Sequence, residues 1–207
     1  MRFCFFLLIS SLLSSVGLAA TNDGWEFAGE TDSVRVYTRP HEGGNIREVK
    51  AQSEIDATSE RVLKVIGDYD HFKDFMPYTR ESREIKREGD DTYFYTYLTP
   101  PIVHNRDYTI KLTKQLVDSR PGYYKVSWQP ANDQGPPPRA KTVRVEIDTG
   151  YWLLEPAAEG KKTLVTYYLY TNPGGAIPTW LANKANRDTL PNIIKAVKNR
   201  IKDKQYD

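Results

Sequence analysis

The chain has 207 residues, of which 39% are hydrophobic and 12% aromatic, and 29 basic residues balance 27 acidic ones. This composition supplies enough apolar side chains for the packed core of one domain, and it excludes disorder over most of the chain. Because no long block of one charge occurs, nothing in the sequence could track a phosphate backbone, and we expect no nucleic-acid partner.

The first 20 residues are typical of a secretory signal peptide. Arg2 precedes an apolar run over residues 3–13, and small residues that include Ala19 follow it. The apolar run is shorter than the roughly 20 residues that a membrane-spanning helix needs, which disfavours the alternative of a retained anchor. We therefore predict that residues 1–20 are removed and that the mature protein is periplasmic or secreted.

The remaining residues 21–207 are predicted to form one domain. Cys4 is the single cysteine of the chain, so cleavage would leave a mature protein without any thiol. Such a protein cannot use a cysteine nucleophile or a disulfide, and it suits an oxidising compartment.

Alternation of apolar and polar side chains predicts a sheet after the leader, interrupted early by two short helices. In chain order, strands are expected over residues 33–39 and 46–55, helices between the capping residues 56–59 and Gly67 and over residues 69–76, and further strands over residues 82–86, 92–99, 105–117, 123–129, 142–155 and 163–171. Turn residues separate these strands regularly, which indicates an antiparallel sheet.

The C-terminal segment changes from strand to helix within a few residues. Pro173, Gly174 and Gly175 end the last strand, and a helix begins near Ile177 with Pro178 in its first turn. Its apolar residues recur at three- and four-residue spacing, namely Ile177, Leu181, Leu190, Ile193, Ile194, Val197 and Ile201. Pro191 is expected to kink this helix or to divide it.

These elements predict an α+β fold in which a curved antiparallel sheet of about 8–9 strands wraps around the long C-terminal helix, with two short helices after the second strand. A sheet that grips one helix need not fill its interior. A ligand cavity is therefore expected between them.

Four segments resemble the START (steroidogenic acute regulatory protein-related lipid transfer) domains, which belong to the helix-grip, Bet v 1-like superfamily. They are Val34–Arg39, Asn105–Tyr108, Val143–Arg144 with Gly150–Trp152 and Pro156, and Pro173–Asn183. The resemblance covers roughly Trp25 to Ile201. It implies a cavity that holds one lipid, with the C-terminal helix and a neighbouring loop as the gate.

The resemblance also implies that Arg106 lies on the cavity wall and pairs with an acid, here Glu84. Arg106 would then anchor a sterol hydroxyl or a lipid head group, and the alternative is an ion pair that no ligand touches. Asp107 alternates to the opposite strand face and is expected to face solvent or Lys111.

The predicted strands present tyrosines on alternate faces, and the sequence leaves open which face lines the cavity. Tyr95 and Tyr97 share one face, opposite Phe94 and Thr96, while Tyr168 opposes Tyr167. The full set of candidate ligand-binding residues is Arg106, Glu84, Tyr95, Tyr97, Trp128, Tyr168, Trp180, Leu181 and Ile194.

The loop Pro130–Ala140 contains three consecutive prolines, Pro136 to Pro138, and matches the loop that covers the cavity mouth in the family. The alternative is a plain hairpin connection. We expect this loop and the C-terminal helix to separate when a lipid enters or leaves.

No catalytic motif is visible, and His41, His71 and His104 lack metal-ligand spacing, so we expect no catalytic residue, metal or cofactor. The predicted function is to bind one lipid (a sterol, a phospholipid or similar) or another hydrophobic molecule. The protein would carry or present it in the periplasm as a monomer that contacts membranes transiently. The alternatives are a cyclase or hydrolase acting on a hydrophobic substrate in the cavity, and an interaction module without a ligand.

Overall fold

A computed structural model describes residues 23–207. The predicted signal peptide therefore lies outside the described residues. Within residues 23–207, no helix is both long enough and apolar enough to cross a bilayer.

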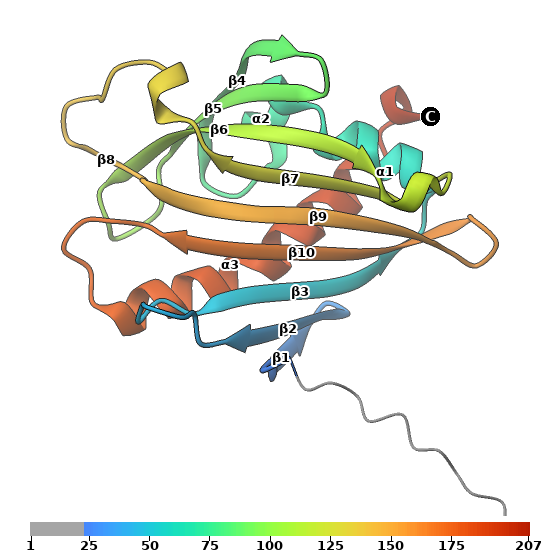
Figure 1. Ribbon diagram of the computed structural model, residues 1–207, viewed down its shortest axis with the longest axis horizontal. Helices are drawn as coiled ribbons and strands as arrows, with labels where there is room; N and C mark the ends of the chain where they lie inside the picture. Colours follow the sequence, from blue (N-terminus) through green and yellow to red (C-terminus); the bar gives the residue numbers. More distant parts are fainter. Residues whose placement is uncertain (1–22) are drawn as a thin grey trace, which may run out of the picture.

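Ten strands form one strongly curved sheet (Figure 1). The strands are β1 (Glu26–Thr31), β2 (Val34–Arg39), β3 (Glu48–Ile55), β4 (Thr79–Glu88), β5 (Asp91–Leu98), β6 (Asn105–Leu116), β7 (Tyr124–Pro130), β8 (Thr142–Arg144), β9 (Ile147–Ala157) and β10 (Lys162–Asn172). Their order is β1-β2-β3-β10-β9-β7-β6-β5-β4, and β8 pairs with β6 off this path. All pairs are antiparallel except β6 with β8, which is parallel.

The antiparallel sheet is confirmed. It contains two further strands, β1 and β8, that the sequence pattern did not predict as separate strands. β1 is almost entirely exposed and shows no buried alternation. The segment predicted as one strand over residues 142–155 divides into β8 and β9, because β8 pairs with β6 whereas β9 pairs with β7 and β10.

The short helices follow β3 as predicted. They are α1 (Ser59–Ile66), a 3-10 turn over Tyr69–His71 and α2 (Phe72–Phe75). Thr58 is the N-cap of α1, and its side chain accepts a hydrogen bond from the Arg61 N–H; Gly67 is the C-cap. α1 contacts β9 and β10, and α2 contacts β4.

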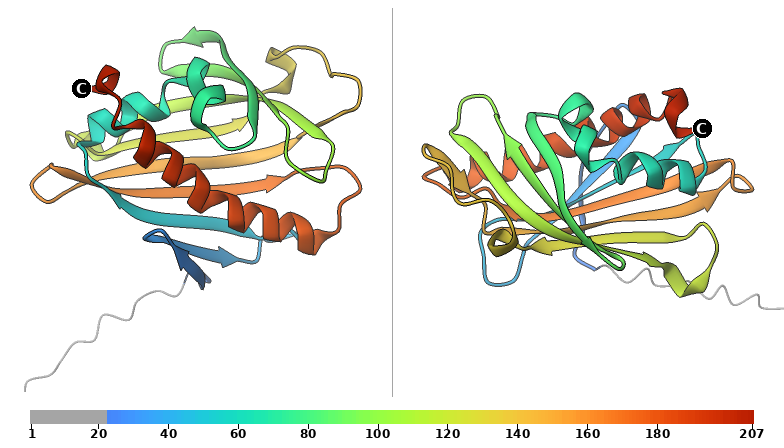
Figure 2. Two further views of the ribbon diagram at one scale, coloured as in Figure 1. Left: turned by 180° about the vertical axis from the view of Figure 1, so that it is seen from behind. Right: turned by 90° about the horizontal axis from the view of Figure 1, so that it is seen from above.

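The long helix α3 (Thr179–Arg200) crosses the concave side of the sheet (Figure 2). It contacts β2, β3 and β10 of the sheet as well as the short helices α1 and α2. α3 continues through Pro191, so of the two expected outcomes, a kink or a division, the division does not occur. Leu190 and Ile194, on either side of Pro191, have no exposed surface, and their packing stabilises the helix across it.

Candidate functional site

A cavity of about 530 Å³ separates α3 from part of the inner face of the sheet. Most of its wall is apolar, and β5, β6, β9 and β10 contribute Phe94, Leu98, Ile110, Leu112, Trp152 and Leu169. A volume of this size and character is typical of a small-molecule site.

The structure identifies which tyrosine face is inside. Thr96 on β5 and Tyr167 on β10 line the cavity, whereas their neighbours Tyr95, Tyr97 and Tyr168 do not. Tyr168 packs instead against Trp25 on the outer side, with a ring separation of 6.1 Å. The three tyrosines chosen as ligand contacts therefore belong to the wrong face of the strands.

Outside the cavity, Asp107 is the centre of a closed hydrogen-bond network. It has no exposed surface. The Arg144 Nε and Nη2 atoms lie 2.7 and 3.0 Å from its two carboxylate oxygens, and the Tyr95 hydroxyl donates to it at 3.2 Å. The expected exposure of Asp107 is wrong because β8 pairs beside β6 and places Arg144 over this face, while Lys111 pairs with Asp91.

On the inner face, Arg106 is 4% exposed and lines the cavity. Its Nε and Nη2 atoms donate to the carbonyl oxygens of Pro173 and Gly174, each at 3.3 Å, and Nη1 donates to the carbonyl of His104. Among residues 23–207 no carboxylate forms an ion pair with Arg106. Burial lowers the pKa of its guanidinium, which nevertheless stays protonated near neutral pH.

The predicted pair between Glu84 and Arg106 does not form. Glu84 binds Arg87, with an Oε2 to Nη2 distance of 2.5 Å. In the sheet register, Glu84 lies opposite Phe94, which lies opposite Ile110, four residues along β6 from Arg106. At about 3.3 Å per residue, the backbone positions of Glu84 and Arg106 are therefore offset by about 13 Å along the strand direction.

Of the other candidates, Trp128 and Leu181 line the cavity together with Arg106. Trp180 is 67% exposed at the start of α3. Ile194 is fully buried in the core, and its neighbour Ile193 faces the cavity instead.

Asp148 on β9 is a polar cavity residue that the sequence analysis missed. It is 7% exposed, and its Oδ1 atom accepts a hydrogen bond from the Trp128 Nε1 atom at 3.1 Å. Burial raises the pKa of this carboxyl to about 7. Asp148 shares one face of β9 with Gly150, Trp152 and Leu154, which are all buried, and this period of two was the signal that could have revealed it.

The loop beside the cavity mouth is the one between β5 and β6. Pro100, Pro101, Ile102 and Val103 line the cavity, as do Ile177 and Leu181 near the start of α3, and Ile102 is at the same time 99% exposed, so the cavity opens beside it. The expected gate loop, Pro130–Ala140, supplies no lining residue.

The loop Pro130–Ala140 is held against the outer network instead. The Asn132 Oδ1 atom accepts from the Thr109 N–H at 2.9 Å, and Arg144 donates to the Pro136 carbonyl at 3.1 Å. The predicted position of this loop over the cavity mouth is therefore wrong, because the same β8 pairing that buries Asp107 carries the loop to the outer face.

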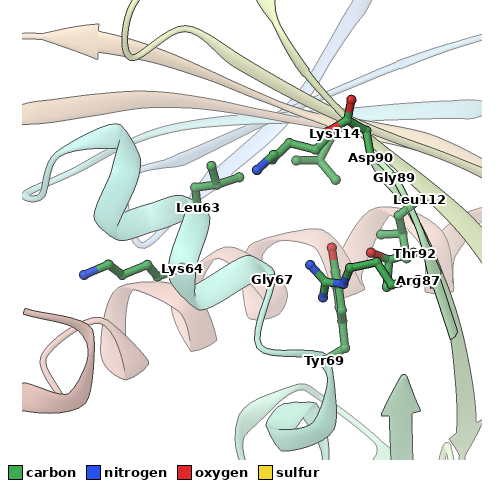
Figure 3. A pocket seen from close by; sticks show the side chains of 11 residues that line it. Leu63, Lys64, Gly67, Tyr69, Arg87, Gly89, Asp90, Thr92, Leu112 and Lys114 are labelled. Carbon is green, nitrogen blue, oxygen red and sulfur yellow. The ribbon is translucent and has the colours of Figure 1, made fainter. Parts of the chain in front are cut away.

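A second hollow of about 210 Å³ lies between α1 and the strands β4 to β6 (Figure 3). Lys114 extends toward Leu63, and Arg87 lies beside Tyr69. Arg87 is already paired with Glu84. This hollow is a weaker candidate for a lipid site than the 530 Å³ cavity because its volume is smaller.

Over residues 23–207, no three His, Cys, Asp or Glu side chains gather in a way that could hold a metal ion. The polar groups of the cavity can form hydrogen bonds and a charge contact with a ligand.

Known proteins resemble this chain over most of its length. The sequence model of the family described as "Polyketide cyclase / dehydrase and lipid transport" matches residues 55–198. The phosphatidylcholine transfer protein of Mus musculus is 27% identical over 86% of this chain and 83% of its own length. An uncharacterized protein of Pseudomonas aeruginosa is 27% identical over 93% of both chains.

Among solved structures, a STAR-related lipid transfer protein from Xanthomonas axonopodis superposes with a TM-score of 0.79. It is 31% identical, and the match covers 87% of this chain and 100% of that one. Human STARD10, at 20% identity and a TM-score of 0.75, shares the fold. The chain therefore belongs to the polyketide cyclase/dehydrase and lipid transport family, as a lipid transfer domain with the START helix-grip fold.

Proposed function

We propose that this protein binds one lipid with an anionic head group in its cavity and carries it between membranes. The observation that supports this most strongly is Arg106, a buried cation on the cavity wall whose hydrogen bonds go to carbonyl oxygens rather than to a carboxylate. Three of its five N–H groups are used, so two remain for a carboxylate or phosphate oxygen of the ligand.

The cavity volume limits the size of the ligand. A volume of about 530 Å³ falls within the roughly 300–1,000 Å³ of pockets that enclose one small molecule. This matches one acyl chain with a small head, as in a fatty acid. A lipid with two chains would require the mouth to widen between the β5–β6 loop and α3.

Exposed apolar side chains around the mouth support transient membrane contact. Ile102 is 99% exposed, Trp180 67% and Tyr78 45%. Ile102 and Tyr78 also line the cavity, and Trp180 adjoins the lining residue Leu181. Such side chains can insert into the boundary between head groups and acyl chains of a bilayer, which would bring the mouth onto the membrane.

The gate in this proposal is the β5–β6 loop together with the start of α3. One cysteine in Pro100–Val103 and one in Ile177–Leu181, at positions whose Cα atoms lie within about 7 Å, would form a crosslink across the mouth. Oxidation should slow lipid uptake and release, and a reductant should restore both. Equal transfer rates in the oxidised and reduced forms, with the crosslink confirmed by mass, would place the entrance elsewhere.

The proposal locates this transport in the periplasm, on the basis of the predicted signal peptide. Fractionation of cells that express the protein with a C-terminal tag should recover a shortened protein in the periplasmic fraction. A variant that lacks residues 2–20 serves as the control and should stay in the cytoplasm. Recovery of both proteins in the same compartment would contradict the location.

Native mass spectrometry of the protein purified from its own cell envelope tests the function itself. We expect one intact anionic lipid per protein chain. A chemically converted product would favour a cyclase or hydrolase, and a chain that carries nothing even after incubation with fatty acids would favour an interaction module.

A further inference from the structure

The cavity wall carries a second group of polar side chains apart from Arg106. We call Thr96, Tyr108, Asp148 and Tyr167 the inner polar cluster; all four line the cavity. Thr96 and Tyr108 lie directly opposite each other on β5 and β6, and Asp148 and Tyr167 come from β9 and β10. The cluster therefore gathers polar groups from four strands onto one apolar wall.

The hydrogen-bonding capacity of this cluster is only partly used. The Asp148 Oδ1 atom accepts from Trp128, and within residues 23–207 nothing donates to its Oδ2 atom and no cation pairs with it. The Tyr167 hydroxyl on the cavity wall also has no hydrogen-bond partner in this part of the chain, whereas the unpaired Thr96 Oγ1 atom has almost no accessible surface and is closed to a ligand. Buried polar groups are normally paired, so open valences that face a cavity indicate a partner inside it.

Asp148 and Tyr167 lie close together, because the Trp128 ring that donates to Asp148 also stacks on the Tyr167 ring at a centroid separation of 5.4 Å. Burial raises the pKa of the Tyr108 and Tyr167 hydroxyls, and the charge of Asp148 raises both further. Arg106 lies two residues before Tyr108 on β6, about 7 Å along the strand, and within residues 23–207 no ion pair joins it to Asp148. A ligand that fills the cavity would therefore meet two polar sites.

We infer that the inner polar cluster recognises a hydroxyl group on the hydrophobic body of the ligand, so that the preferred ligand is a hydroxylated anionic lipid. This inference rests on the proposed function, since it requires a ligand in the cavity. A hydroxyl both donates and accepts, so it can pair with Asp148 whether the carboxyl is neutral or charged, and also with the Tyr167 hydroxyl. A plain alkyl chain leaves these groups unpaired.

Binding of palmitate and of hydroxypalmitates tests the inference, with the hydroxyl placed at successive carbons along the chain. For the wild-type protein, one hydroxyl position should bind at least about tenfold more tightly than palmitate, because a site built to bond a hydroxyl discriminates against the analogue that lacks it. The affinities can be measured by titration calorimetry below the critical micelle concentrations.

Two variants and one control connect the preference to the cluster. Asp148→Leu should abolish the preference while palmitate still binds. Tyr167→Phe, which keeps the ring stacked on Trp128, should lower it by about threefold to tenfold. Asp148→Asn keeps both an acceptor for Trp128 and a donor for the ligand, and it should retain the preference.

The outcomes separate this inference from the proposed function. If palmitate binds but no hydroxypalmitate binds more tightly, the inference is wrong and the proposed function stands. A preference that survives in both Asp148→Leu and Tyr167→Phe would also overturn it. If neither palmitate nor any hydroxypalmitate binds the wild-type protein, the proposed function fails as well.

Discussion

Arg106 and Asp107 are neighbours in sequence and are both buried, at 4% and 0% exposure, yet the two faces of β6 treat them differently. On the outer face, Asp107 accepts two hydrogen bonds from Arg144 and one from the Tyr95 hydroxyl. On the inner face, Arg106 has carbonyl partners and no carboxylate among the described residues. The outer polar groups thus stabilise the fold, and the inner ones remain available for a ligand.

Breaking the outer network should have the largest effect. Asp107→Leu leaves Arg144, whose side chain is only 12% exposed, without its partner and should lower the free energy of unfolding by about 3–5 kcal/mol. Urea denaturation measures this loss. The double variant Asp107→Leu with Arg144→Leu should recover part of it, because no unpaired charge remains. A loss below about 1 kcal/mol in Asp107→Leu would show that the network does not support the fold.

On the inner face, the buried Asp148 should make the protein less stable as the pH rises. An ion-paired carboxylate has the opposite effect, because it stabilises the protein more as the pH rises. Asp148 has its pKa raised from 3.8 to about 7, so between these values the folded state holds a proton that the unfolded state has lost. Stability relative to Asp148→Asn should therefore fall as the pH rises from about 4 to about 7, by up to about 4 kcal/mol, and then level off.

Denaturation of the lipid-free wild-type protein and of Asp148→Asn across this pH range provides the measurement. The variant is the matched control because it cannot titrate at this position. A difference between the two proteins that does not change with pH would mean that Asp148 is not desolvated in the folded state.

The smallest effect is expected for Glu84→Gln. The Glu84 and Arg87 side chains are 29% and 58% exposed, and ion pairs at such positions contribute about 0–1 kcal/mol. Both the free energy of unfolding and the lipid affinity should therefore change little. A loss of lipid affinity similar to that of an Arg106 variant would restore the pairing that the family resemblance implied.

The sequence pattern predicted much of the fold because alternation and turn residues are local signals. The strands β2 to β7, the end of α1 at Gly67 and the long α3 all follow from such signals. β1 was missed because it buries almost no side chain, and β8 because its three residues pair in parallel with a strand far back in the chain.

The site was harder to predict because it depends on register and on the choice of strand face. Apolar or amphipathic residues occupy both faces of β5 and β10, so the pattern could not decide between Tyr167 and Tyr168. The pairing of Glu84 with Arg106 failed because the register across three strands is not contained in any local segment. Asp148, in contrast, follows from alternation with the buried Trp152.

The central claim is that Arg106 remains open for the head group of a lipid. Its most direct test compares the affinities of palmitate and hexadecanol, which share one chain and differ in charge, for wild-type protein, Arg106→Met and Arg106→Lys. The wild-type protein should prefer palmitate by about tenfold or more, Arg106→Lys should keep part of this preference, and Arg106→Met should bind both equally. An undiminished preference for palmitate in a folded Arg106→Met protein would contradict the claim.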